Sequence, residues 1–266
     1  MTGRGSLLVA AAFALLASGC GGGGGDAKRE LQQTAARLDT IRSGNLNLSL
    51  VVLPSTGTKG RVGFALRGPF ALRKGGLPVA DITYTQLAGG RSASATFVSN
   101  GTTAYAKVGG RRIALPAAAT EEITRAAGGP AGKGTLSGLR IDTWLKDPTV
   151  SDGGRVGGAD TDHVSAKLDV VNAANGLLAL VRQLGRDAPT ISGDSADQLR
   201  KAVKSSSIDV WAGKRDHLLR RLLLRVKLGF DVPSELKRAL GEVVGAKVEF
   251  ELAISDPNRP IRAPGA

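Results

Sequence analysis

In one stretch of the sequence, residues 206–230, apolar and polar residues alternate so regularly that the pattern constrains the fold of the whole chain. It holds two strand-like runs, 207–211 and 218–230, and the turn between them contains Gly213 and Asp216, which suit a tight reversal. We therefore predict a β-hairpin. The second run has basic residues at one parity and apolar residues at the other, namely Leu222, Leu224, Val226, Leu228 and Phe230. Its 13 residues would extend about 43 Å, and a strand of that length indicates a large, curved antiparallel sheet.

The first 25 residues have the pattern of an export signal followed by an anchor. Residues 1–19 carry one charge, Arg4, and an apolar run at 7–17 that is too short to span a membrane. The run ends in LASGC at 16–20, which resembles the lipobox of bacterial lipoproteins, and Cys20 is the only cysteine of the chain. We predict a signal peptide over 1–19, a lipidated Cys20 and a flexible glycine tether within 20–25. The alternative is an ordinary signal peptide followed by an incidental cysteine.

The charge balance is strongly basic. The chain has 36 Lys and Arg against 23 Asp and Glu, a net charge of +13. Nucleic acid would be the first candidate partner for such a chain, but export removes it, and an anionic membrane surface remains. Arg220, Arg221, Arg225 and Lys227 are the candidate contacts, and a generally solubilising surface is the alternative.

The rest of the chain divides into further helices and strands. The apolar spacing predicts helices at 26–43, 120–127, 172–185, 194–204 and 234–244, with Thr120 and Asp194 as caps. Alternation predicts strands at 45–53, 61–72, 79–87, 92–98, 103–108, 112–115, 155–156, 162–171 and 247–255. A bulge or a sheet edge is expected at Gly68-Pro69, and residues 136–145 fit a helix or a loop. We predict one domain, 26–257, followed by an extended tail, 258–266.

No group of residues forms a catalytic constellation. Gly193-Asp194-Ser195 resembles the nucleophile block of the GDSL esterases, and Asp160 with His163 fits their Asp-x-x-His, but the two blocks stand in the reverse order. Asp194 is explained more simply as a helix cap. With two His and one Cys in the chain, metal ligation has little support. We expect no enzyme activity, no cofactor and no metal.

The apolar faces of the strands consist mainly of aliphatic side chains, since aromatic residues make up only 4% of the chain. Such faces suit flexible acyl chains, which gain about 0.8 kcal/mol per buried CH₂ without directional contacts. A close-packed core would show the same pattern. The candidate lining residues are Leu48, Leu50, Leu222, Leu224, Val226, Leu228, Phe230, Val248, Phe250, Leu252 and Ile254.

Several motifs together resemble the actinobacterial LppX and LprG lipoproteins. They are the lipobox, the glycine tether, VGGADTDHV at 156–164, the hairpin and the ending NRPIRAP at 258–264. The resemblance implies an α+β fold, a strongly curved antiparallel sheet or half-open barrel with helices on its concave face, as in the LolA and LolB carriers. It also implies an apolar cavity for lipids or lipoglycans, a place on the outer face of the cytoplasmic membrane, and a membrane lipid exporter as a candidate partner. The competing function is a non-transporting accessory lipoprotein with a packed core, and a GDSL-like hydrolase is third.

Overall fold

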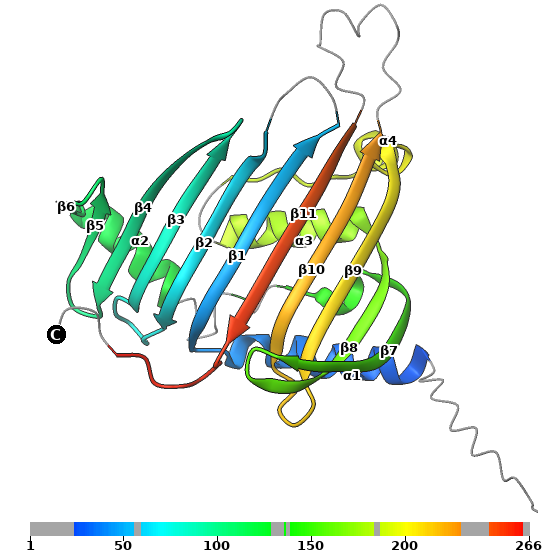
Figure 1. The fold of residues 1–266 in the computed structure, drawn as a ribbon, viewed down its shortest axis with the longest axis horizontal. Coiled ribbons are helices and arrows are strands. Elements are labelled where there is room, and N and C mark those ends of the chain that lie inside the picture. The colour runs from blue at the N-terminus through cyan, green and yellow to red at the C-terminus, as the bar shows by residue number, and fades with distance from the viewer. Residues whose placement is uncertain are drawn as a thin grey trace, which may run out of the picture.

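The computed structural model describes residues 24–55, 60–128, 136, 139–183, 187–229 and 245–262. Its main feature is an antiparallel sheet of eleven strands in the order β6-β5-β4-β3-β2-β1-β11-β10-β9-β8-β7 (Figure 1). The sheet is open, with β6 at one edge and β7 at the other. The strands are β1 Ser43–Pro54, β2 Val62–Ala71, β3 Val79–Ala88, β4 Arg91–Asn100, β5 Ala104–Val108, β6 Arg111–Ala114, β7 Leu145–Val156, β8 Ala159–Leu168, β9 Val203–Gly213, β10 Leu219–Gly229 and β11 Gly245–Ser255.

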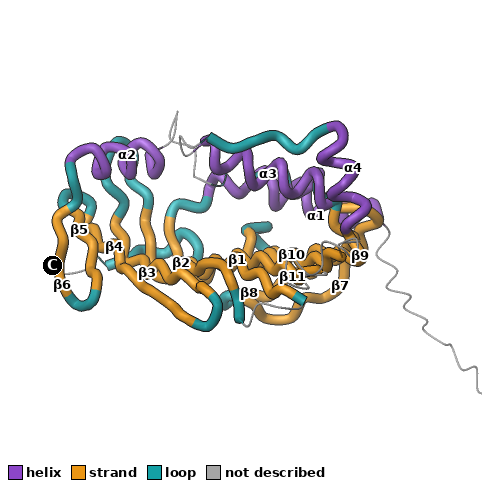
Figure 2. The backbone as a smooth tube through the Cα atoms, turned by 90° about the horizontal axis from the view of Figure 1, so that it is seen from above, coloured by secondary structure: helices purple, strands orange, loops and turns teal. Residues whose placement is uncertain are grey.

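The described helices lie on one side of the sheet, which is its concave side (Figure 2). They are α1 Gly24–Arg37, η1 Leu38–Thr40, α2 Ala117–Gly128, η3 Ile141–Thr143, α3 Val170–Gln183 and α4 Gly193–Ala202. α1 packs near β7 and β8, and α2 lies over the opposite end of the sheet, near β4 and β5 (Figure 2). The predicted fold class, a curved antiparallel sheet with helices on its concave face, is therefore confirmed.

The hairpin that the sequence predicts is the pair β9 and β10. The two strands pair antiparallel, with Leu222 opposite Val210 and Leu224 opposite Ile208. β11 pairs with the other edge of β10 and joins the hairpin to β1. Because β1 and β11 are neighbours, the two halves of the chain form one continuous sheet.

Some local predictions are wrong in their boundaries. β7 extends over twelve residues where a two-residue strand was expected. α2 begins before Thr120, whose hydroxyl donates to the Pro116 carbonyl inside the helix instead of capping it. Asp194 lies in the first turn of α4, and Ser192 occupies the N-cap position. The helix predicted over 234–244 lies outside the described residues.

Gly68 is neither at a bulge nor at a sheet edge, contrary to expectation. β2 lies between β1 and β3, and its register with β3 is the same on both sides of Gly68-Pro69. A Cβ atom at Gly68 would come within 1.9 Å of the Asp81 carbonyl oxygen, and its φ is +139°. Glycine therefore stands there because the neighbouring strand passes too close for any side chain.

The start of the predicted tail is bonded to the sheet. The Arg42 N–H donates to the Asn258 side chain at 2.8 Å, and the Asn258 N–H donates to the Ser43 carbonyl at 2.9 Å. The Ser43 hydroxyl also donates to the Arg259 carbonyl at 2.7 Å. Residues 258–259 thus close the end of β1, a role that the extended-tail prediction did not include.

Candidate functional site: the concave face of the sheet

One row of paired residues crosses all eleven strands on the concave face. Directly opposite residues of antiparallel neighbours share a face, so the row follows from the strand register alone. From β7 to β6 it comprises Val150, Val164, Val210, Leu222, Leu252, Leu48, Leu66, Tyr84, Ala95, Val108 and Arg111. We call it the concave row. It is apolar from end to end except at its last residue.

The half of the concave row near α1 is packed. Val164, Leu222 and Leu252 are each at most 1% exposed, and they belong to a core cluster with side chains from the helix layer. The helix layer contributes Ala27, Leu31, Leu38, Ile141, Trp144 and Ala173. Figure 2 shows α1 and α3 over this half of the sheet. Side chains fill the space between the sheet and these helices.

The other half of the concave face is only partly covered, with α2 over its end near β4 and β5 (Figure 2). Tyr84 is 40% exposed and Val108 is 44% exposed, although both continue the row that is fully buried in β8 to β11. Val62 and Ile113 share this face by register, and they are 45% and 50% exposed. Four of the six large apolar side chains with high exposure in the described part of the chain therefore lie on this half of one face. We call it the open floor, β2 to β6 on the concave side.

The described lining residues that the sequence predicts lie on β1, β10 and β11, in the packed half or at its margin. Leu222, Leu224, Phe250, Leu252 and Ile254 are buried in the core cluster, and Leu48, Leu50 and Val226 are partly buried at its margin. Val248 and Leu228 are also partly buried, and Phe230 lies outside the described residues, as does Cys20. The structure thus brings the candidates together on one face, but most of them contact other side chains of the protein.

Sequence reasoning missed the residues of the open floor. Phe64, Leu66, Tyr84 and Phe97 face the same way as Leu48 and Leu50, and none of them is buried. Phe64 and Tyr84 stack with ring centroids 6.3 Å apart. Their strands were predicted, so the alternation could have placed these residues on a face. Nothing in the alternation shows that the side chains on this part of the face stay exposed.

The convex face above β8 to β11 carries a network of paired charges. Arg221 Nε donates to Glu251 at 2.8 Å, and Arg225 reaches Asp209 at 3.2 Å and Glu249 at 3.5 Å. His163 lies 2.9 Å from Asp209 and stacks on Trp211. Of the four cations predicted to meet a membrane, Arg221 and Arg225 are neutralised here. Lys227 is exposed and makes no ion pair with a described residue.

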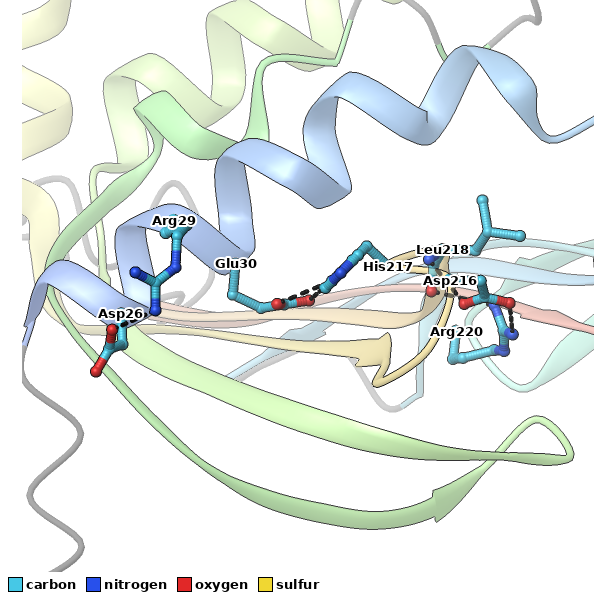
Figure 3. A network of polar contacts seen from close by, with 7 residues as sticks. All are labelled: Asp26, Arg29, Glu30, Asp216, His217, Leu218 and Arg220. Atoms are coloured by element: carbon cyan, nitrogen blue, oxygen red, sulfur yellow. Dashed lines mark hydrogen bonds and ion pairs between the residues drawn. The ribbon is translucent and has the colours of Figure 1, made fainter.

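The turn between β9 and β10 is bonded to α1, as Figure 3 shows. His217 Nδ1 lies 3.0 Å from both carboxylate oxygens of Glu30, a buried residue of α1. Arg220, which is 5% exposed, donates to Asp216 at 2.7 Å and to the Leu218 carbonyl at 3.1 Å. Arg220 is therefore a structural residue and not a surface cation.

A cavity of about 450 Å³ lies beside this turn, between residues 155–160 and 213–216. Five of its eight lining residues carry a charge, namely Arg155, Asp160, Lys214, Arg215 and Asp216. Lys214 pairs with Asp152 at 2.9 Å, and its backbone N–H donates to the Asp160 carbonyl. A polar cavity of this kind is unsuited to acyl chains, so the apolar ligand site is sought on the open floor instead.

Asp216 has a lowered pKa. Its partial burial acts to raise the pKa, but the hydrogen bonds from Arg220 and from the Leu218 N–H, with the charge of Arg220, outweigh burial. A carboxylate with a lowered pKa stabilises the folded state at a pH above its unfolded pKa, about 3.9. That stabilisation is lost as the pH falls through the folded pKa.

We expect Asp216→Asn to lower the free energy of unfolding by about 2 kcal/mol at neutral pH. Leaving a fully buried partner charged and unpaired costs about 3–5 kcal/mol, and the 42% exposure of the Asp216 side chain reduces that figure. The difference between wild type and variant should stay constant from about pH 5 to 8 and shrink below about pH 4, since protonated wild-type Asp216 loses the same ion pair. Urea unfolding at several pH values measures it, and a difference that grows in acid would contradict the assignment.

The hydrolase hypothesis gains no support from the geometry. His163 faces the convex side with Asp209 and Trp211, whereas α4, which carries Ser195, lies with the other helices on the concave side (Figure 2). Within the described residues there is no cluster of three or more His, Cys, Asp or Glu that could hold a metal ion. In the same part of the chain, no helix is long and apolar enough to cross a membrane.

Structure comparison finds proteins similar to this chain. LprF from Mycobacterium bovis is 14% identical with a TM-score of 0.47, over 91% of this chain and 97% of that one. The lipoprotein LppX from Mycobacterium tuberculosis is 13% identical with a TM-score of 0.39, over 91% of this chain and 100% of that one. A LolA-superfamily protein from Nitrosomonas europaea is 11% identical with a TM-score of 0.21, over 88% and 94%.

These structures include LppX, one of the lipoproteins that the sequence resembles, and a LolA-superfamily protein, whose architecture that resemblance implies. No protein-family model matches the sequence, and no curated protein matches it. At these identities and scores, the likeness gives no information about a ligand or an activity.

Proposed function

We propose that this protein is a lipid-anchored, extracytoplasmic lipoprotein that binds acyl chains of a lipid or lipoglycan on the open floor and carries them within the cell envelope. The observation that carries the proposal is the concave row. It stays apolar across ten strands, is fully buried in β8 to β11, and reaches 40–44% exposure at Tyr84 and Val108. A simply packed core would not leave large apolar side chains of the same row exposed.

The chemistry of the open floor suits an acyl chain better than a polar ligand. Its apolar residues are Val62, Phe64, Leu66, Ile82, Tyr84, Ala95, Phe97, Ala106, Val108 and Ile113, and the polar residues that share the face are Gln86, Arg91, Ser99 and Arg111. Aliphatic and aromatic carbon gains about 25 cal/mol for each Å² removed from water. Leu48 and Leu50 of β1 adjoin the floor, and Val248 and Val226 on the next two strands would extend the site toward the packed half.

The anchor would be Cys20, with 20–25 as a tether between the lipid and the folded domain. α1 begins at Gly24, so only a short segment separates the proposed lipid from the first helix. One acyl chain gives marginal membrane attachment, and a second chain or a basic surface makes it stable. A membrane lipid exporter would be a fitting partner for a carrier held at the outer face of the cytoplasmic membrane.

Solvent extraction tests the carrier function directly. The mature chain, residues 20–266 with Cys20→Ser, is purified from the periplasm of a bacterial host and extracted with organic solvent, and the extract is examined by mass spectrometry. We expect acyl lipid in near-stoichiometric amount. An extract with no more lipid than that of an exported control protein would contradict the carrier function and favour an accessory lipoprotein.

Cys20 should take up fatty acid when the full chain is expressed in a lipoprotein-processing host. Growth with an alkyne-tagged fatty acid should label the wild type and leave Cys20→Ser unlabelled, because the chain has no other thiol. The matched control is Ser18→Ala, which keeps Cys20 and a small residue before it. Label that persists in Cys20→Ser would show that the anchor is elsewhere.

A further inference from the structure

The net positive charge of this protein is concentrated in one part of the sheet, where acidic residues are nearly absent. Residues 43–114, which form β1 to β6, contain nine Lys and Arg and one acid, Asp81. We call this part the basic wing. The charge imbalance of the whole chain, +13, therefore arises mostly from about a quarter of its length. Figure 1 shows β5 and β6 at the end of the sheet farthest from α1.

The described cations of the basic wing form no ion pair with a described residue. Every ion pair between described residues lies outside 43–114, for example Arg221 with Glu251 and Arg225 with Asp209. Described cations of the wing without an ion pair are Arg61, Arg67, Arg73, Lys74, Arg91, Lys107, Arg111 and Arg112, and all but Lys107 are exposed. An uncompensated field of this kind attracts a polyanion.

Three of these cations stand in one row on the convex face. The register places Asn47, Arg67, Thr83, Thr96, Lys107 and Arg112 opposite one another across β1 to β6. Arg67 donates to Asn47 at 3.1 Å, the Thr83 and Thr96 hydroxyls lie 3.1 Å apart, and Arg112 lies over the Tyr105 ring. From β2 to β6 the row spans four strand spacings, about 19 Å.

The opposite side of the wing differs in charge and polarity. α2, which carries Glu121 and Glu122, lies on the concave side, where the open floor is apolar (Figure 2). The convex side presents these cations and hydroxyl groups together with one acid, Asp81, which shares the face two residues from Thr83. A row of this composition suits a flat array of phosphate groups, to which cations and hydroxyls both donate hydrogen bonds.

We propose that the convex face of the basic wing docks on the surface of an anionic lipid bilayer. The inference rests on the proposed export of the chain, which leaves the membrane as the large polyanion within reach. The wing would provide a second point of attachment at the far end of the sheet from α1, the helix that follows the proposed anchor. The carrier body would then lie along the membrane instead of extending from it.

Charge removal on two halves of the same convex face tests the docking surface. The test variant combines Arg67→Gln, Lys107→Gln and Arg112→Gln. The matched control combines Lys167→Gln, Lys227→Gln and Lys247→Gln, three exposed cations of the convex face outside the wing, none of which pairs with a described acid. Both variants lose three charges from the mature chain with Cys20→Ser, and thermal melting shows that each remains folded.

Partition onto phosphatidylglycerol–phosphatidylcholine vesicles is measured by flotation. Each cation close to an anionic bilayer strengthens binding about fivefold, so the wing variant should bind between about tenfold and about a hundredfold more weakly. The control should change about twofold or less, and binding to pure phosphatidylcholine should be weak for every protein. High salt should remove the difference, since it screens the charges.

Three results would overturn the docking surface. Equal losses in both variants would mean that net charge alone matters, and unchanged binding of the wing variant would place the contact elsewhere. Tight binding to soluble polyphosphate combined with weak binding to anionic vesicles would indicate a soluble polyanion as partner. Lipid extracted from the wing variant should match the wild type, because the open floor is untouched, so a failure here leaves the carrier function standing.

Discussion

Ala95→Trp should strip the protein of its bound lipid without lowering its melting temperature. Ala95 lies in the concave row between Tyr84 and Val108, which are 40% and 44% exposed. An indole there enters the proposed ligand space beside these exposed side chains, so it displaces ligand and does not compress the core. The extract should contain several-fold less acyl lipid, and the lipid-free variant should melt within about 2 °C of the lipid-free wild type.

Leu224→Trp is the matched control in the packed half of the same face. Leu224 is 4% exposed and lies opposite Ile208 and Phe250, which are also buried. Adding volume to a packed core costs about 1–3 kcal/mol, which corresponds to a fall of roughly 2–12 °C in melting temperature. Both proteins must be compared after lipid removal, because bound ligand raises apparent stability by mass action.

The two substitutions separate an open site from a packed one. If Ala95→Trp melts early and carries as much lipid as the wild type, the floor is not the ligand site. If Leu224→Trp loses lipid and keeps its melting temperature, the ligand lies among the residues that the sequence first indicated, near Leu222 and Phe250. If neither variant nor wild type carries lipid, the accessory lipoprotein remains the better description.

The hairpin could be predicted to within a few residues because its signals are local. Alternation along β10 and a Gly213–Asp216 turn specify the two strands without reference to the rest of the chain. β7 was mostly missed, since its register with β8 shifts between Lys146 and Thr149 and again between Asp152 and Gly154. Each shift breaks the period of two on which strand prediction depends.

The candidate site was harder to predict because it depends on which part of the concave face the helices cover. Leu222 and Tyr84 lie in the same row, yet one is fully buried and the other 40% exposed. The difference comes from the position of α1 and α3 along the sheet, which no strand pattern contains. The basic surface shows the same limit. The sequence alone does not show that Arg221 and Arg225 are paired. Their partners Asp209, Glu249 and Glu251 become evident only from the register of β10 with β9 and β11.

Trp144→Ala should strongly destabilise the fold, because it removes packing in the packed half and leaves the open floor unchanged. Trp144 is 1% exposed within the core cluster beside η3. Truncating a buried Trp typically lowers the free energy of unfolding by about 3–5 kcal/mol, a fall of roughly 6–20 °C in melting temperature for a chain of this size. Lipid bound per folded molecule should stay as in the wild type, which is the reverse of the result expected for Ala95→Trp.

A second substitution shows whether Trp144 acts by supporting α3. A Cβ atom at Gly176 of α3 would lie 2.5 Å from Trp144 Cζ2, so Gly176→Ala should cost about 1–3 kcal/mol in the wild type. In the Trp144→Ala background the clash is gone, and Ala should stabilise the helix by up to about 1 kcal/mol relative to Gly. Opposite signs in the two backgrounds give a coupling energy above about 1 kcal/mol. Equal effects in the two backgrounds would mean that α3 does not pack on the Trp144 ring. Another contact would then have to fix the position of α3, which separates the packed half from the open floor.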